Sequence, residues 1–309
     1  MNLITKIAGR EFESYTLNAS VPRASTLDEL KQIGQSDSAA IMMKSCTIKK
    51  RKGNPLPRIF KLPLGYFNSE GLPNLGYKTY LEFIPKLKKY NKPIIVSVAG
   101  FSVDEYKILV KAFQESEVDL IEINLSCPNI DNKTEPIAYN LKKTEEVLKE
   151  ISYLGKKPIG LKLPPYPYYS IQQKIANLIK KYSVSFLSCV NTLGNSLIID
   201  EIKERSVIKA TRGFGGLSGQ YIKPIALGNV RRFYELLKGK VSIMGMGGVK
   251  TGQDVFEFLL AGADAVQIGT AFVEEGVSCF QRINKELKSI LRKKGYSSIS
   301  KARGKLKIS

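Results

Sequence analysis

Eight short apolar segments alternate with turns and amphipathic segments, and this alternation is what most limits how the chain can fold. Strands that alternate with helices form parallel sheets, and eight parallel strands close into a barrel. We therefore expect a (β/α)8 TIM barrel that spans residues 1–309 as a single domain. A doubly wound open sheet is the alternative, and it would need fewer strands or an antiparallel edge. The expected strands are residues 16–18, 39–43, 94–98, 120–125, 159–163, 186–190, 241–244 and 265–268.

Apolar residues spaced three or four apart predict helices between these strands. Thr26-Leu-Asp-Glu29 has the form of a capping box that opens one helix, and Thr251-Gly-Gln-Asp254 opens another less perfectly. The remaining helices are expected at residues 77–89, 103–116, 142–153, 171–181, 225–237 and 278–294.

The chain contains no histidine, which removes Ser-His-Asp and Cys-His chemistry and most zinc and haem sites. Acid–base catalysis must therefore use Cys, Lys, Asp, Glu, Tyr or Ser. The four cysteines are scattered and form no Cys-x-x-Cys pair, so we expect neither a disulfide framework nor a metal site. They are Cys46, Cys127, Cys189 and Cys279.

The formal charge of +20 invites a nucleic-acid interpretation. Lysine-rich clusters at residues 86–89 and 292–294 fall at the ends of expected helices, where cations are favourable, so we favour solvated helix faces and expect no nucleic-acid partner. No apolar run approaches the roughly 18 residues of a membrane span. Residues 1–10 lack the pattern of a signal peptide, so we expect a cytoplasmic protein without a membrane partner.

Two long segments follow expected strands, at residues 44–77 and 127–139. Both leave the carboxyl ends of their strands, where the active sites of barrel enzymes lie. Long loops of this kind are commonly lids or binding loops, with plain disorder as the alternative. We therefore expect function to concentrate at this end of the barrel.

Polar side chains stand where several strands end. Cys127 lies between Asn124 and Asn129, and Pro128 stiffens the exit from the strand. Lys44 and Lys162 belong to otherwise apolar strands, where a buried lysine is costly unless it meets an anion. With Asn191 and Thr192 at the end of the sixth strand, the set suits a planar, hydrogen-bonding organic ligand with negative charge.

Glycines follow the last two strands, as Gly247-Gly248 and Gly269-Thr270. Barrels often bind a phosphate group through backbone N–H groups of these two loops, so we favour a phosphate site over a plain tight turn. The glycine-rich residues 213–219 are expected to form a flexible loop that lies against a cofactor.

Four motifs resemble those of dihydroorotate dehydrogenases: Asn124-Leu-Ser-Cys-Pro-Asn129, Lys162-Leu-Pro-Pro165, Val190-Asn-Thr-Leu-Gly-Asn195, and residues 213–219 with Tyr221-Ile-Lys-Pro224. Three others resemble the soluble class 1 branch that reduces fumarate: Asn54-Pro-Leu-Pro-Arg58, Asn68-Ser-Glu-Gly-Leu-Pro-Asn74 and Thr251-Gly-Gln-Asp254. The resemblance covers nearly the whole chain, with the motifs in the family's order.

The resemblance implies that dihydroorotate is oxidised to orotate, with FMN as cofactor, fumarate as acceptor (giving succinate) and a homodimer as the assembly. Cys127 would remove the C5 proton while a hydride passes from C6 to the flavin, and residues 49–57 would form a lid. The implied substrate-binding residues are Lys44, Asn68, Gly71, Leu72, Asn124, Asn129, Asn191 and Thr192. The implied FMN-binding residues are Ala19, Ser20, Lys44, Ser45, Asn124, Lys162, Val190, Gly219, Gly247, Gly248, Gly269 and Thr270.

The sequence departs from the family pattern at three positions. Glu70 replaces an expected Met and would repel the orotate carboxylate unless it points away; Val21 replaces Gly; Thr192 replaces Ser and keeps the hydroxyl. An FMN-dependent tRNA dihydrouridine synthase and a non-catalytic flavin-binding barrel are the alternatives, and Glu70 also leaves a related pyrimidine open as substrate. An NAD-using enzyme with an iron–sulfur partner subunit is a further alternative.

Overall fold

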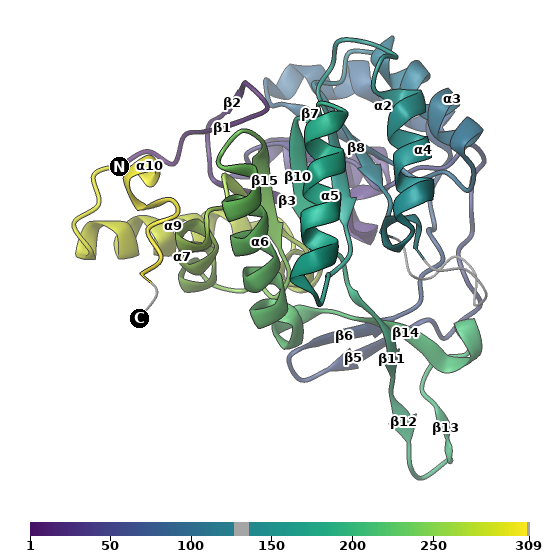
Figure 1. Cartoon of the computed structure of the whole chain (residues 1–309). Coiled ribbons are helices and arrows are strands. Elements are labelled where there is room, and N and C mark those ends of the chain that lie inside the picture. Colours follow the sequence, from purple (N-terminus) through teal and green to yellow (C-terminus); the bar gives the residue numbers. More distant parts are fainter. Residues whose placement is uncertain (127–135, 308–309) are drawn as a thin grey trace.

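The computed structural model describes residues 1–126 and 136–307, and a closed barrel of parallel strands forms its centre (Figure 1). Its eight strands neighbour one another in the order β3-β16-β15-β10-β9-β8-β7-β4, which confirms the predicted barrel. The strands are β3 Thr16–Asn18, β4 Ile41–Met42, β7 Ile94–Val98, β8 Leu120–Asn124, β9 Ile159–Leu163, β10 Phe186–Cys189, β15 Ser242–Met246 and β16 Ala265–Ile268.

The side chain of Asn18 closes the barrel between β3 and β4, the two strands at the ends of the sheet order. Its amide donates to the carbonyl oxygen of Met42 over 2.7 Å, and its oxygen accepts the Met42 N–H over 3.0 Å. The N–H of Ala39 also donates to the carbonyl oxygen of Thr16 over 2.8 Å. A fully buried carboxamide thus replaces ladder hydrogen bonds that β3 and β4 are too short to make.

The predicted helices are present and cover the outside of the barrel (Figure 1). Both capping boxes form, with Thr26 and Glu29 opening α1 and Thr251 and Asp254 opening α7. Short helices α8 and α10 were not predicted. The helices are α1 Leu27–Gln35, α2 Tyr77–Leu87, α3 Val103–Gln114, α4 Leu141–Ile151, α5 Tyr169–Lys181, α6 Lys223–Leu237, α7 Gly252–Ala261, α8 Thr270–Glu275, α9 Ser278–Lys293 and α10 Ile299–Ala302. The 3-10 turns are η1 Pro22–Ala24, η2 Lys88–Tyr90, η3 Ile137–Tyr139, η4 Ala210–Gly213 and η5 Gly219–Ile222.

An amino-terminal hairpin of β1 (Thr5–Ile7) and β2 (Arg10–Phe12) closes the base of the barrel. Ile7 and Phe12 pack in one buried cluster with residues near the amino ends of the strands, among them Leu120 and Phe186. The main hydrophobic core lies between the strands and the helices. Since the base is filled with apolar side chains, only the carboxyl end of the barrel is left for a ligand.

A second sheet lies beyond the carboxyl ends of the barrel strands (Figure 1). Its four antiparallel strands have the order β11-β14-β6-β5, and a further hairpin, β12–β13, projects from it. These strands are β5 Ile59–Leu62, β6 Gly65–Asn68, β11 Leu193–Leu197, β12 Ile199–Asp200, β13 Arg205–Ser206 and β14 Phe214–Leu217.

The prediction of a flexible loop at residues 213–219 was wrong, because most of it is strand β14. Gly216 pairs with Asn68 and Leu217 with Phe67, so the strand is defined by partners almost 150 residues away in the sequence. The long segment after β4 likewise contains the β5–β6 hairpin. Its predicted lid, residues 49–57, lies outside these strands, and Arg51 forms an isolated antiparallel bridge with Asn74.

No helix within residues 1–126 and 136–307 combines the length and the apolar character that a membrane span requires.

An ion pair at the barrel base ties the carboxyl-terminal segment to β16. The guanidinium of Arg303 lies 2.8 Å from the carboxylate of Asp264, which also accepts the N–H of Ile243 over 2.8 Å. Burial raises the pKa of Asp264 to about 6, although Arg303 and this N–H oppose the shift. An unfolded-chain aspartate has a pKa of about 3.9, so the contribution of Asp264 to stability falls as the pH rises from about 4 to 6.

We expect Arg303→Gln to lower the free energy of unfolding by about 2–3 kcal/mol at pH 8, because it leaves a buried carboxylate without its cation. The loss should be smaller at pH 5, where Asp264 is protonated in the folded state. Urea unfolding at both pH values measures this difference. Adding Asp264→Asn should abolish the pH dependence of the loss, and an equal loss at pH 5 and pH 8 would contradict this account.

Candidate active site

A cavity of about 220 Å³ opens at the carboxyl ends of the barrel strands. Every predicted site residue that the structure describes lines this cavity, whereas Cys127 and Asn129 lie outside the described residues. The predicted residues in its lining are Ala19, Ser20, Lys44, Ser45, Asn68, Gly71, Leu72, Asn124, Lys162, Val190, Asn191, Thr192, Gly219, Gly247, Gly248, Gly269 and Thr270.

Sequence reasoning missed much of the cavity's apolar wall. Ile59 of β5, Tyr66 of β6 and Val273 of α8 line it. No local pattern marks Ile59 and Tyr66, because long-range folding brings the β5–β6 hairpin here, and Val273 lies in the unpredicted helix α8. Ser218 and Met246 also line the cavity, and both lie within or beside the glycine-rich stretches that were singled out. Partial burial and the neighbouring Glu274 carboxylate raise the pKa of Tyr66.

A hydrogen-bonded polar network forms the floor of the cavity. The ammonium of Lys162 donates to the hydroxyl of Ser20 over 3.1 Å, and this hydroxyl lies 3.2 Å from that of Ser45. The carboxamide of Asn124 donates to the Ser45 hydroxyl over 3.0 Å. The Ser45 hydroxyl also forms a hydrogen bond of 2.8 Å with the hydroxyl of Ser97. Five barrel strands are therefore linked at this end, and all of these side chains except Ser97 also line the cavity.

Two lysines bring positive charge into this buried region. Lys44 and Lys162 expose only 7% and 6% of their surface, and both line the cavity. A buried ammonium is stabilised by an anion, and its field favours negative charge on whatever lies beside it. The site therefore suits an anionic ligand or one that gains negative charge during a reaction.

Asn191 and Thr192 are held in place at the end of β10. The Asn191 carboxamide donates to the hydroxyl and the carbonyl oxygen of Ser126, over 3.0 and 3.2 Å, and accepts the Thr192 N–H over 2.8 Å. A β-carbon added at Gly216 would overlap the Thr192 hydroxyl, so that glycine leaves room for the side chain. The Asn191 carboxamide is therefore held in place before any ligand binds.

Backbone amides of Gly71 and Leu72 form a second group of donors. Both residues have left-handed backbone conformations, with φ of +71° and +57°. The Gly71 carbonyl accepts from the Arg51 guanidinium over 3.2 Å, whereas neither amide has an acceptor among the described residues. Successive free N–H groups form a concavity that binds anions such as carboxylates. The predicted lid, residues 49–57, packs behind this segment, since the Asn54 N–H donates to the carbonyl of Glu70.

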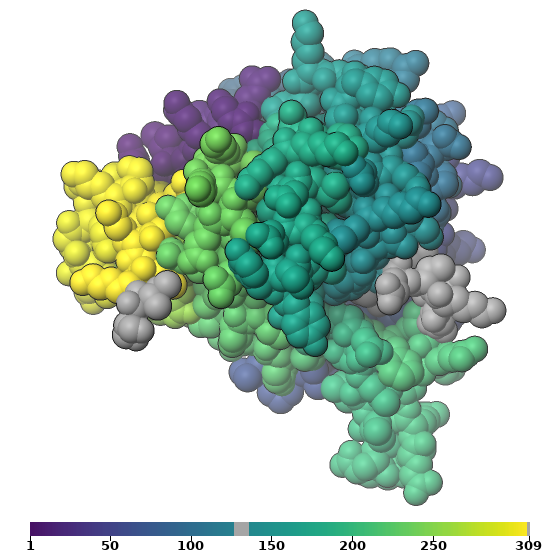
Figure 2. All heavy atoms as spheres, in the orientation of Figure 1, coloured from purple at the N-terminus to yellow at the C-terminus, as the bar shows by residue number. Residues whose placement is uncertain are grey.

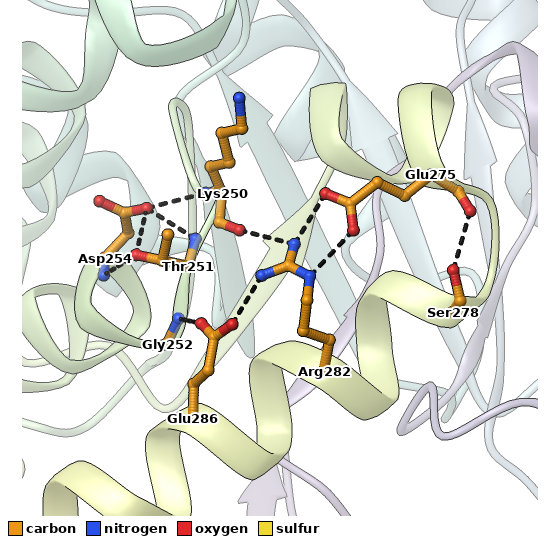
Figure 3. Close-up of polar contacts among 8 residues, drawn as sticks. All are labelled: Lys250, Thr251, Gly252, Asp254, Glu275, Ser278, Arg282 and Glu286. Carbon is orange, nitrogen blue, oxygen red and sulfur yellow. Dashed lines mark hydrogen bonds and ion pairs between the residues drawn. The ribbon is translucent and has the colours of Figure 1, made fainter.

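Gly247 and Gly248 provide a third group of donors on the cavity wall. Their φ values are +122° and +75°, and a β-carbon on Gly248 would lie 2.6 Å from that of Lys223. Within the part of the chain that the structure describes, neither glycine amide has an acceptor. Beyond Val249 the amides differ, because those of Lys250 and Thr251 donate to the Asp254 carboxylate (Figure 3).

The three departures from the family pattern have different outcomes. Val21 has φ −99° and ψ 173°, an extended conformation that needs no glycine, and its side chain lines the cavity. Thr192 is accommodated beside Gly216. Glu70 is half-buried and lines the cavity, so the predicted effect of its charge on a carboxylate ligand stays a prediction.

Three of the four cysteines are unsuited to act as bases. Cys46, Cys189 and Cys279 are fully buried, and burial raises their pKa values, to about 12 for Cys189 and Cys279. Their thiols therefore stay protonated near neutral pH. Within residues 1–126 and 136–307, no three His, Cys, Asp or Glu side chains gather closely enough to hold a metal ion.

A family model described as dihydroorotate dehydrogenase matches residues 2–291. The chain belongs to the dihydroorotate dehydrogenase family. Membership of this family implies a flavin cofactor in general terms.

Relatives within the dihydroorotate dehydrogenase family match almost the whole chain. A protein of Saccharomyces mikatae named dihydroorotate dehydrogenase (fumarate) is 44% identical, covering 99% of this chain and 98% of its own. Dihydroorotate dehydrogenase A (fumarate) of Lactococcus lactis subsp. cremoris (strain MG1363) is 45% identical, and the match covers 99% of this chain and 99% of that protein. The solved structure of ligand-free dihydroorotate dehydrogenase from Eimeria tenella shares the fold, with a TM-score of 0.83 and 21% identity, over 98% of this chain and 91% of that one.

Gly219 offers a test of how the cavity wall is built. Its φ is +81°, and a β-carbon there would overlap the backbone of Leu64 and Gly65, where the β5–β6 hairpin crosses it. We expect Gly219→Ala to destabilise the protein by about 2 kcal/mol and to weaken flavin binding about tenfold, because the hairpin must shift. Thermal unfolding and flavin fluorescence titration measure these effects.

Gly228→Ala is the matched control, because its added methyl group meets open space in the exposed part of α6. That substitution should leave flavin binding unchanged and add up to about 1 kcal/mol of stability. The account of the wall fails if the two variants behave alike.

Proposed function

We propose that the protein oxidises (S)-dihydroorotate to orotate in de novo pyrimidine biosynthesis, with FMN as its cofactor and fumarate as its electron acceptor. The observation that carries this proposal is the joining, in one cavity, of two buried lysines with two groups of backbone N–H donors that have no acceptor among the described residues. One group suits a carboxylate and the other a phosphate. The names of the relatives support the substrate and the acceptor.

The lining fits FMN. The amides of Gly247 and Gly248 can bind its phosphate, and Lys162 can balance negative charge on the ring system. FMN held by these residues would supply the acceptor for the hydride from C6 of dihydroorotate. The residues proposed to hold it are Ala19, Ser20, Lys44, Ser45, Asn124, Lys162, Val190, Gly219, Gly247, Gly248, Gly269 and Thr270.

The substrate is proposed to lie between the carboxamides and the segment at residues 68–72. The amides of Gly71 and Leu72 receive its carboxylate, and the fixed carboxamides hydrogen-bond to its ring. Lys44 contributes positive charge beside both ligands. The proposed substrate residues are Lys44, Asn68, Gly71, Leu72, Asn124, Asn129, Asn191 and Thr192, of which Asn129 lies outside the described residues.

Cys127 is proposed as the catalytic base that removes the C5 proton, although it also lies outside the described residues. It is the third residue after Asn124, a cavity residue, whereas the other three thiols are buried with raised pKa values. A thiol with an ordinary pKa of about 8.5 needs a positive environment to act as thiolate near neutral pH. Lys44 and Lys162 supply positive charge in the cavity.

We expect Cys127→Ser to slow reduction of the bound flavin by dihydroorotate at least about 100-fold, because the hydroxyl is a far weaker base than the thiolate. Stopped-flow absorbance under anaerobic conditions measures this rate, and flavin content shows whether the cofactor is retained. The control Cys279→Ala changes a thiol on α9 and should keep the wild-type rate. If Cys127→Ser reduces the flavin at the wild-type rate, Cys127 is not the base.

A homodimer is part of the proposal, and the β12–β13 hairpin supports it. This hairpin projects from the molecule (Figures 1 and 2) and exposes 59% of Ile199 and 88% of Ile202, with Leu197 beside it exposed at 44%. Clustered exposed apolar side chains on a projecting element are typical of interaction surfaces.

We expect light scattering to give the wild-type protein a molar mass twice that of one chain. Ile202→Asp should shift it towards the single-chain mass, because a charge would be buried at the interface. Ile108→Asp, at a site on α3 that is 49% exposed, is the control and should leave the mass unchanged. A wild-type mass equal to one chain would refute the dimer.

The cytoplasmic location, the absence of a nucleic-acid partner and the single-domain organisation stay predictions.

A further inference from the structure

One guanidinium group connects three segments beside the cavity. Arg282 of α9 donates to both carboxylate oxygens of Glu275, over 3.0 and 2.7 Å, and to the carboxylate of Glu286 over 2.8 Å (Figure 3). It also donates to the carbonyl oxygen of Lys250 over 3.0 Å. The planar fork of arginine suits such a junction, since its donors have fixed directions.

The segments that it joins are the exits of β15 and β16. Lys250 lies two residues beyond Gly248, in the turn that follows β15. Glu275 is the last residue of α8, which begins at Thr270 directly after Gly269. Beyond the pairing of β15 with β16, Arg282 therefore bridges the two segments that follow these strands.

Carboxylates occupy the outer side of the same turn. Glu286 accepts the N–H of Gly252 over 2.6 Å, and Asp254 accepts the N–H groups of Lys250 and Thr251 over 2.9 and 2.8 Å (Figure 3). The turn is thus anchored on both sides of the Lys250 carbonyl. The amides of Gly247 and Gly248, which line the cavity, have no acceptor among the described residues.

We propose that Arg282 is a positioning residue for phosphate binding. It keeps the backbone N–H donors that follow β15 at the right distance from those that follow β16. This inference rests on the proposed function, because it takes the ligand at these glycines to be the phosphate of FMN. Arg282 itself does not line the cavity, so it acts through the backbone that it holds. A tetrahedral dianion needs hydrogen-bond donors at fixed separations. If the segment after β15 or β16 were less firmly held, some of the hydrogen bonds to the phosphate would be lost.

Riboflavin separates this role from a general structural one, because it carries the same ring system without the phosphate. We expect Arg282→Met to raise the dissociation constant for FMN about tenfold and to leave that for riboflavin within about twofold. Fluorescence titration of apoprotein with each flavin gives both constants. Arg282→Lys keeps the charge but not the fork, and it should give an intermediate loss for FMN alone.

Arg231→Met is the matched control. Arg231 makes similar bonds, to Glu235 over 2.8 Å and to the carbonyl of Gly304 over 3.2 Å, but neither it nor these partners line the cavity. This variant should bind both flavins as the wild type does.

The outcomes separate the two proposals. Wild-type protein that binds no FMN would refute the proposed function and this inference with it. Wild-type binding combined with equal weakening of FMN and riboflavin in Arg282→Met, or with no weakening of FMN in either Arg282 variant, would refute the inference alone. Thermal unfolding of each variant confirms that it is folded during the titration.

Discussion

Closure of the barrel by Asn18 is the constraint on which the site depends. The hydrogen bonds between Asn18 and Met42 join β3 to β4 at the two ends of the sheet order, so that eight carboxyl ends form one rim. Residues as distant in sequence as Ser20, Lys162 and Thr270 meet in one cavity for this reason. The amino-terminal hairpin fills the other end with apolar side chains, which leaves the rim as the place where polar groups can face a ligand.

The floor and the walls of the cavity carry different polar groups. Buried lysines and the serine–asparagine network lie on the floor, the amides of Gly71 and Leu72 on one wall, and those of Gly247 and Gly248 on another. The donors on the two walls are backbone groups, so their positions depend on how the loops are anchored. Arg51 and Asn54 anchor one loop, whereas Asp254, Glu286 and Arg282 anchor the other. The anchors are charged or polar side chains that a ligand need not touch.

The sequence predicts the barrel well because its signals are local. Each strand and each long helix shows its own periodicity, and polar residues at strand ends, such as Lys162 and Asn191, indicate the site directly. The second sheet escapes prediction because β14 contains two glycines and becomes a strand only by pairing with β6. Tyr66 and Ile59 enter the cavity through the same long-range folding. The contacts of Arg282 join α9 to two loops, which no local pattern can indicate.

An anaerobic absorbance titration with dihydroorotate, followed by fumarate, tests the central claim most directly. The flavin bands report each half-reaction because the cofactor carries the redox chemistry. The account predicts that dihydroorotate bleaches the bands and that fumarate restores them. Bleaching without recovery would contradict fumarate as the acceptor. A flavin that stays oxidised with dihydroorotate would contradict the substrate, and a related pyrimidine or tRNA would then be the next substrate to test.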